Sequence, residues 1–315
     1  MANTTSLEVH KFSTMADGAD AVLHIHEIIG GAGDGPTVGI SGSIHGNENT
    51  GSQIIRALWP ILSQAPIKGR IRLLPVANPR AFAANHRFTP TDELNLNRQF
   101  PGDPKGSFTD QLAAAITRDF LEKLDIYIDL HAGTDRPIVD YVYILNDENL
   151  SRAFGSRVLY RPKEGVGGTT FSGTSKAVTV DARGCPTVVV ELGGGIVDQA
   201  PYVQRGVDGV INMLKAAGVY DEDPVAPPSQ IVVRGIDSIG STQGGWLETE
   251  APALGEKIDG GAVLGRVVSP YTFEELEVIS NPVEKGIMIL SHPRRNLVEP
   301  GDFAYMVGDL ADAED

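Results

Sequence analysis

The chain has 315 residues, 41% of them hydrophobic and 21% charged, and its formal net charge is -15. The length allows one large domain and a smaller one, each with a buried core. The acidity excludes general nucleic-acid binding and docking on anionic lipid, which both need a basic surface, and it requires that local arginines capture any anionic substrate.

The N-terminal segment MANTTSLEVHKF lacks the apolar stretch of a signal peptide, and no run reaches the roughly 18 apolar residues of a membrane span. We therefore expect a cytoplasmic protein with no membrane partner. Cys185 is the single cysteine, which excludes an intramolecular disulfide, and we expect it to be a small buried group. Assembly into a homo-oligomer stays open.

Apolar runs rich in Val and Ile, bounded by Gly, Pro or Asn, predict strands in the first two thirds of the chain. Amphipathic helical patterns separate several of these runs, which indicates a mostly parallel mixed sheet flanked by helices. The predicted strands are 21–29, 37–44, 69–78, 125–133, 139–145 and 185–194. The predicted helices are 49–64, 107–124, with Ser107 or Thr109 as its N-cap, and 203–218.

The composition changes at residues 220–230, an acidic, proline-rich stretch that is typical of a linker. Short strand-like pieces cut by Gly and Pro follow it, without a helical pattern. We therefore predict an α/β catalytic domain over residues 1–222 and a small all-β domain over residues 223–315. The acidic tail, residues 308–315, is expected to be disordered.

Three of the predicted strands lead into side chains that bind metals or transfer protons. His45 and Glu48 follow predicted strand 37–44, His131 lies near the end of predicted strand 125–133, and Glu191 lies in predicted strand 185–194. In open α/β sheets, ligands bind beyond the carboxyl ends of the strands. A catalytic zinc takes three imidazole or carboxylate ligands and leaves one position for water, whereas Mg²⁺ and Ca²⁺ prefer oxygen ligands alone. His45, Glu48 and His131 therefore predict one zinc ion per chain.

A hydrolytic zinc site also needs a base that takes a proton from water and passes it to the leaving amine. Glu191 lies between apolar residues and the glycines of LGGG, where burial is expected to raise its pKa. A glutamate that caps the strand or pairs with an arginine is the alternative. Asp129 shares a strand face with His131, and it either orients that ring or is a plain structural partner.

Three arginines, Arg80, Arg87 and Arg98, lie in the polar segment 78–103, and Asn97 precedes the last of them. Arginine binds a carboxylate through two parallel hydrogen bonds. The segment therefore predicts a substrate-binding cluster, with a solvated surface as the alternative.

The segments HGNE, NPRAF, NHRF, DELNLNRQF, DLHAG and VVVELGGG together resemble the succinylglutamate desuccinylase/aspartoacylase family, which has a zinc carboxypeptidase-like fold. The resemblance covers roughly residues 38–215, and the C-terminal part resembles the small domain of this family. It implies zinc ligands at His45, Glu48 and His131, and a general base and acid at Glu191.

The same resemblance assigns the substrate side of the site. Arg87 matches the arginine that polarises the scissile carbonyl, and Asn97 and Arg98 match the pair that grips the substrate carboxylate. The family motif is a shorter D-L-N-R, so Asn95 competes with Asn97 for this role. Residues 160–184 do not match the substrate-side residues of aspartoacylase.

These residues predict a zinc-dependent amide hydrolase that deacylates a small N-acyl amino acid, and the resemblance implies an N-acetyl-diaminobutyrate-like substrate. A metallocarboxypeptidase that cuts peptides is the alternative: an open groove would favour peptides, and a narrow entrance would favour small substrates. A carrier module is a third hypothesis, because the C-terminal glycine-rich pieces are faintly similar to lipoyl-type domains. Lys257, however, does not lie in the tight turn that such a carrier requires.

Overall fold

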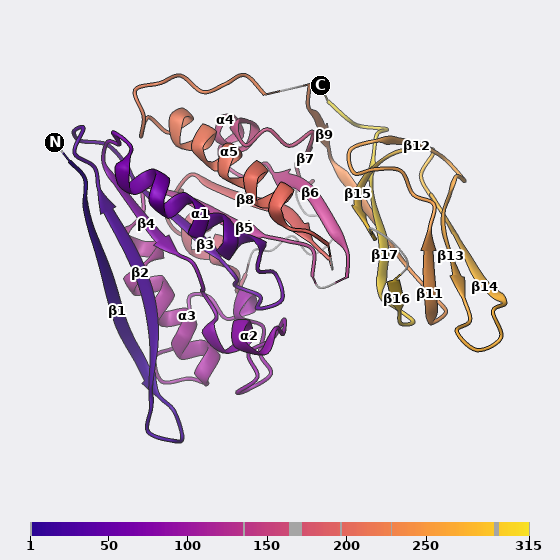
Figure 1. Cartoon of the computed structure of the whole chain (residues 1–315), viewed down its shortest axis with the longest axis horizontal. Coiled ribbons are helices and arrows are strands. Elements are labelled where there is room, and N and C mark those ends of the chain that lie inside the picture. The colour runs from indigo at the N-terminus through magenta and orange to yellow at the C-terminus, as the bar shows by residue number, and fades with distance from the viewer. Residues whose placement is uncertain are drawn as a thin grey trace.

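The structure is a computed structural model of the chain, and it describes residues 2–134, 136–163, 172–195, 197–227, 229–292 and 296–314. An α/β unit is built on a large mixed sheet, and an all-β unit that contains a second, antiparallel sheet lies beside it (Figure 1). The predicted fold class is therefore confirmed. Among the described residues, no helix has the length and apolar character that crossing a membrane requires.

The α/β unit contains eight of the described strands and all of the described helices. Its strands are β1 (Thr4–Thr14), β2 (Asp20–Ile29), β3 (Thr37–Gly42), β4 (Arg70–Leu74), β5 (Ile126–His131), β6 (Ile138–Tyr143), β7 (Val158–Tyr160) and β8 (Thr187–Gly194). Its helices are α1 (Thr50–Gln64), α2 (Pro79–Ala84), α3 (Phe108–Asp119), α4 (Glu148–Ala153) and α5 (Ala200–Ala216). Single turns add η1 (Leu96–Arg98), η2 (Leu121–Lys123) and the π-helical η3 (Ala177–Asp181).

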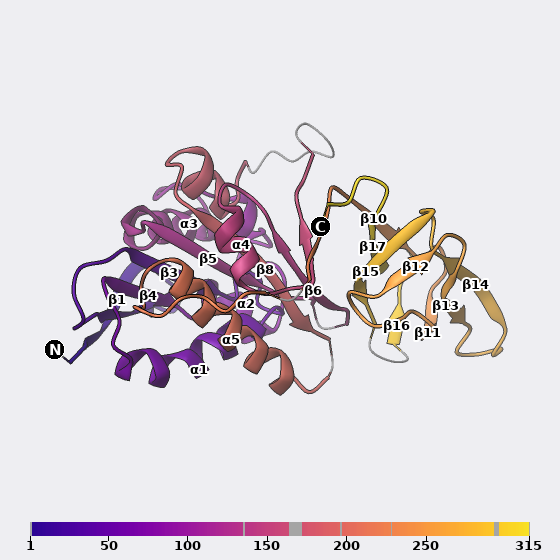
Figure 2. The same cartoon turned by 90° about the horizontal axis from the view of Figure 1, so that it is seen from above.

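Strands β4, β3, β5 and β8 are parallel neighbours at the centre of the large sheet, and β6 continues it antiparallel to β8. Helices α1 and α5 cover one face, and α3 covers the other (Figure 2). Both faces are thus buried, which explains why most residues of the central strands are apolar. Ser107 caps α3 in a capping box with Asp110, so the first of the two predicted N-caps is the one used.

The C-terminal third has no helix within its described residues and consists of short strands. They are β9 (Ile231–Val233), β10 (Gly235–Gly240), β11 (Gly245–Thr249), β12 (Lys257–Asp259), β13 (Val263–Val268), β14 (Glu275–Ser280), β15 (Lys285–Ser291), β16 (Asn296–Val298) and β17 (Phe303–Asp309). Strands β14, β13, β11 and β16 form the smaller sheet, in that order. Lys257 lies within β12 rather than at a hairpin tip, which does not favour the carrier hypothesis.

Two features of the C-terminal third bear on the predicted domain boundary and on the predicted disorder of the tail. Strand β15 pairs with β6, so the large sheet continues into the C-terminal strands, and we keep the boundary between residues 222 and 223 as a proposal. The prediction of a disordered tail is wrong for its described residues. Glu314 exchanges two backbone hydrogen bonds with Val232 of β9, at 2.8 and 2.9 Å. These bonds pair backbone polar groups of the tail and hold it against β9.

Candidate metal centre

The strand ends bring the predicted metal ligands together at one edge of the sheet. His45 and Glu48 lie between β3 and α1, and His131 is the last residue of β5, the parallel neighbour of β3. On the other side of β5, the strand register places Glu191 of β8 opposite His131. Because parallel strands end at the same edge, residues far apart in sequence converge there.

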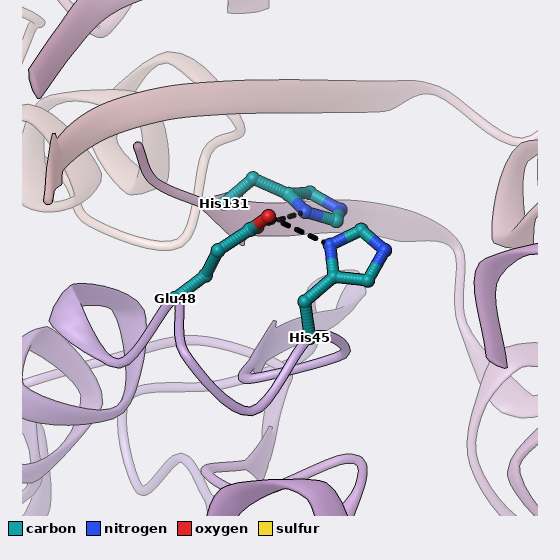
Figure 3. A group of neighbouring side chains, drawn as sticks. All are labelled: His45, Glu48 and His131. Atoms are coloured by element: carbon teal, nitrogen blue, oxygen red, sulfur yellow. Dashed lines mark hydrogen bonds and ion pairs between the residues drawn. The ribbon is translucent and has the colours of Figure 1, made fainter. Parts of the chain in front are cut away.

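His45, Glu48 and His131 form a compact buried cluster (Figure 3). Each offers a ligand atom, and these atoms all lie within 4.8 Å of one another. Nδ1 of His45 is 2.8 Å from Oε1 of Glu48, and Nδ1 of His131 is 2.8 Å from Oε2 of the same carboxylate. Each imidazole therefore points its Nδ1 atom toward the Glu48 carboxylate.

The outer ring nitrogens of both histidines have partners of their own. Nε2 of His131 lies 3.3 Å from Oδ2 of Asp129, and Nε2 of His45 lies 3.2 Å from Oδ1 of Asn95. The hydroxyls of Ser41 and Ser175 donate to the fully buried Asp129. Such partners fix the ring orientation and the tautomer of a metal-binding histidine.

Glu48 and His131 each keep their charged form although they are buried, because neighbouring groups of opposite charge stabilise it. Burial opposes the ionisation of Glu48, yet His45 and His131 lower its pKa well below the usual range. Burial also opposes the positive charge of His131, but Asp129 and Glu48 raise its pKa well above the usual value. A cation at this place would meet an ionised carboxylate.

A cavity of about 930 Å³ opens beside the cluster, and the remaining predicted residues line it. Burial raises the pKa of Glu191 to about 7, with a further increase from Glu48 and an opposing effect of His131. A guanidinium nitrogen of Arg87 lies 2.7 Å from Oε1 of Glu48. Arg98 is exposed and donates to the backbone oxygen of Asn97 at 2.6 Å.

The structure separates Asn97 from its competitor in the motif. Asn97 lines the cavity, and its Oδ1 accepts a hydrogen bond from the backbone of Ser175, which leaves the Nδ2 amide as a donor. Asn95 lies behind His45 instead. Arg80 lies in the first turn of α2 and is not among the described residues that line the cavity. The three arginines of segment 78–103 therefore do not form a single cluster in the site.

Several cavity residues were missed in the sequence. Tyr141 and Tyr143 of β6 line the cavity, and Lys176 lies over the Tyr143 ring, 5.2 Å from its centroid. No motif marks them, because β6 and the turn before η3 become neighbours only in the folded sheet. The C-terminal unit also contributes to the wall, through Leu290, His292, Glu299, Asp302, Phe303 and Met306.

The fold and this cluster define an α/β protein with a metal-type donor set at the carboxyl ends of its strands, beside a carboxylate suited to proton transfer. Residues 34–217 match the family described as the succinylglutamate desuccinylase/aspartoacylase catalytic domain. The N-alpha-acetyl-L-2,4-diaminobutyric acid deacetylase of Halomonas elongata is 31% identical over 252 residues, which are 75% of this chain and 71% of that protein. The chain therefore belongs to the succinylglutamate desuccinylase/aspartoacylase family.

Solved structures agree with this fold along nearly the whole chain. A succinylglutamate desuccinylase from Silicibacter sp. TM1040 has a TM-score of 0.82 at 26% identity, covering 98% of this chain and 94% of that one. The product-bound ectoine utilization protein EutE (DoeB) from Ruegeria pomeroyi has a TM-score of 0.82 at 23% identity, covering 98% and 95%. The likeness to EutE shows the fold.

Proposed function

We propose that this protein is a zinc-dependent hydrolase that removes the acyl group from a small N-acyl amino acid. The observation that carries the proposal is the convergence of His45, Glu48 and His131, with Glu191 on the neighbouring strand. Family membership and the deacetylase name of the Halomonas elongata relative support it, and they make an N-acetyl-diaminobutyrate-like molecule the first substrate to test.

The donor set suits zinc. Nδ1 of His45 is buried and has no hydrogen-bond partner in the described part of the chain, although Oε1 of Glu48 is only 2.8 Å away. A buried nitrogen without a hydrogen bond needs an explanation, and a cation shared with Glu48 and His131 supplies one. Two imidazoles and one carboxylate make a catalytic zinc set with one open position. When bound, the ion would polarise the acyl carbonyl and acidify the attacking water.

Glu191 is the proposed proton carrier. With a pKa raised to about 7, its carboxylate can accept a proton from water and return it to the leaving amine near neutral pH. Arg87 reaches the cavity from beside Glu48 and would donate to the developing oxyanion, an interaction typically worth roughly 3–4 kcal/mol. The bond between the acyl carbon and the nitrogen then breaks, giving a carboxylate and a free amino acid.

Arg98 and Asn97 are the proposed anchors for the substrate carboxylate. Arg98 is exposed to the cavity, and the Nδ2 amide of Asn97 is left to donate beside it. Two donors on one carboxylate fix the orientation of the substrate, and thereby the position of its acyl carbon. The net charge of -15 makes this local capture necessary.

The peptidase alternative is less well supported. Six residues of the C-terminal unit form part of the cavity wall, which favours a small substrate over an extended peptide. A screen for amine release tests the deacylase and peptidase hypotheses. It uses acetyl, succinyl and formyl derivatives of acidic and basic amino acids together with unblocked peptides. We expect turnover of an N-acyl amino acid. Cleavage of the peptides alone would overturn the proposal.

A further inference from the structure

The segment that follows His131 joins the metal centre to the C-terminal unit. Its described residues are 132–134 and 136–137, between β5 and β6, and all of them line the cavity. Beyond it, β6 pairs with β15 in the large sheet. Figure 2 shows the C-terminal strands next to β6. The segment therefore lies where the two units meet.

Arg136 binds this segment to the C-terminal unit through three contacts. Its Nη1 atom donates to Oδ2 of Asp302 at 3.1 Å and to the backbone oxygen of Leu297 at 3.1 Å. The side chain of Asn296 donates to the Arg136 backbone oxygen at 3.3 Å. Oδ2 of Asp302 also accepts from the backbone nitrogen of Glu299, at 3.0 Å. The Asp302 side chain therefore bonds both to Arg136 and to the backbone of the turn that follows β16.

The other end of the segment is held against the end of β8. The backbone nitrogen of Gly133 donates to Gly193 at 3.1 Å, and that of Gly195 donates to Thr134 at 2.8 Å. A Cβ atom on Gly133 would lie 2.2 Å from the backbone oxygen of Pro137. Because this packing leaves so little room, a displacement at Arg136 must move the cavity wall at residues 132–134.

We propose that Arg136 and Asp302 form a latch that holds the C-terminal unit against the segment after His131 and so sets the size of substrate that the cavity admits. Arg136 itself lines the cavity. The role proposed for it is that of a positioning residue, which acts through residues 132–134 and the turn at Glu299. This inference rests on the proposed deacylase function. The side chains of the pair are 35% and 43% exposed, so the latch contributes little to overall stability and its effect is geometric.

The test is a double-mutant cycle of Arg136→Gln, Asp302→Asn and the combined variant. The measured quantity is the ratio of kcat/KM for a short N-acetyl amino acid to that for a long-chain N-acyl amino acid and for an N-acetyl dipeptide. Each single variant should lower this ratio about fivefold, mainly through KM, which is the size of effect that a partly exposed ion pair supports. The combined variant should lower it no further, because the two residues act as one unit.

Hydrogen exchange gives a readout that does not depend on activity. Backbone exchange at residues 132–134 and 136 should rise about as much in either single variant as in the combined one. Arg266→Gln is the matched control. Arg266 is 36% exposed, pairs with Glu250 and Glu275 in the smaller sheet, and is not among the described residues that line the cavity. It should leave both readouts at the wild-type level.

An unchanged ratio and unchanged exchange in either single variant would overturn the latch, as would additive losses in the combined variant or an equal loss on all substrates. Failure of the proposed function looks different, because the wild-type protein itself would then release no amine from any N-acyl amino acid. In that case the exchange experiment still decides whether the latch exists.

Discussion

Nδ1 of His131 lies 2.8 Å from Oε2 of Glu48, although 83 residues separate them in the chain. The contact exists because His131 ends β5 and Glu48 follows β3, its parallel neighbour. Nδ1 of His45 approaches the other oxygen of the same carboxylate at 2.8 Å. Glu48 is thus the centre of the cluster, and the proposed chemistry depends on it.

Metal removal is the most direct test of this cluster. A chelator should reduce amide hydrolysis to background, and about one equivalent of zinc per chain should restore it. His131→Ala should lose both zinc and activity, because it removes one of three ligands. Elemental analysis of the purified variants measures the zinc content. Full activity in metal-free protein would contradict the proposal.

Glu191→Gln should separate metal binding from proton transfer. The glutamine has nearly the same shape but cannot accept the proton, so kcat should fall by about 100- to 10,000-fold. Zinc content should stay at the wild-type level, because Glu191 is not part of the ligand cluster. A variant that keeps wild-type kcat would remove Glu191 from the mechanism.

The pH dependence follows from the raised pKa of Glu191. The ionised carboxylate is the form that accepts a proton, so kcat/KM should fall as the pH drops through this pKa. The value is about 7 without a cation, and a bound cation lowers it, because positive charge favours the ionised form. We expect a single-proton decline with its midpoint at or below about 7. A midpoint well above 7, measured over the acidic limb, would contradict this assignment.

Asn95 and Asn97 should give opposite phenotypes although they are two residues apart. Asn95→Ala removes the partner of Nε2 of His45, so zinc binding should weaken by roughly 10- to 100-fold. Asn97→Ala removes a proposed donor to the substrate carboxylate, so KM should rise about tenfold with zinc retained. Zinc titration and steady-state kinetics on both variants provide the comparison, and the reverse pattern would exchange the two roles.

Local patterns predicted much of the fold. The apolar runs at β3, β5 and β8 and the amphipathic pattern at α1 are properties of consecutive residues, set by side-chain periodicity. The rule that parallel strands end at one edge of a sheet then predicts that His45, Glu48 and His131 lie together. Arg87 and Glu191 also lie at the cavity as expected.

Other features depend on partners that no local pattern specifies. The pairing of β15 with β6 joins residues about 150 positions apart, and it brings Leu290 and Asp302 to the wall of the cavity. The single turn η1 places Asn97 at the cavity and its N-cap residue, Asn95, within hydrogen-bond distance of Nε2 of His45.

Periodicity and residue chemistry are local, so the amino-acid sequence was enough to predict six of the eight strands of the α/β unit, its three longest helices and the donor types at the strand ends, but not β1 or β7. The tertiary structure alone decided which C-terminal side chains close the cavity, which asparagine faces it, and that Arg80 lies outside it. Those outcomes depend on how distant segments pack and satisfy their polar groups, and that is a property of the whole folded chain.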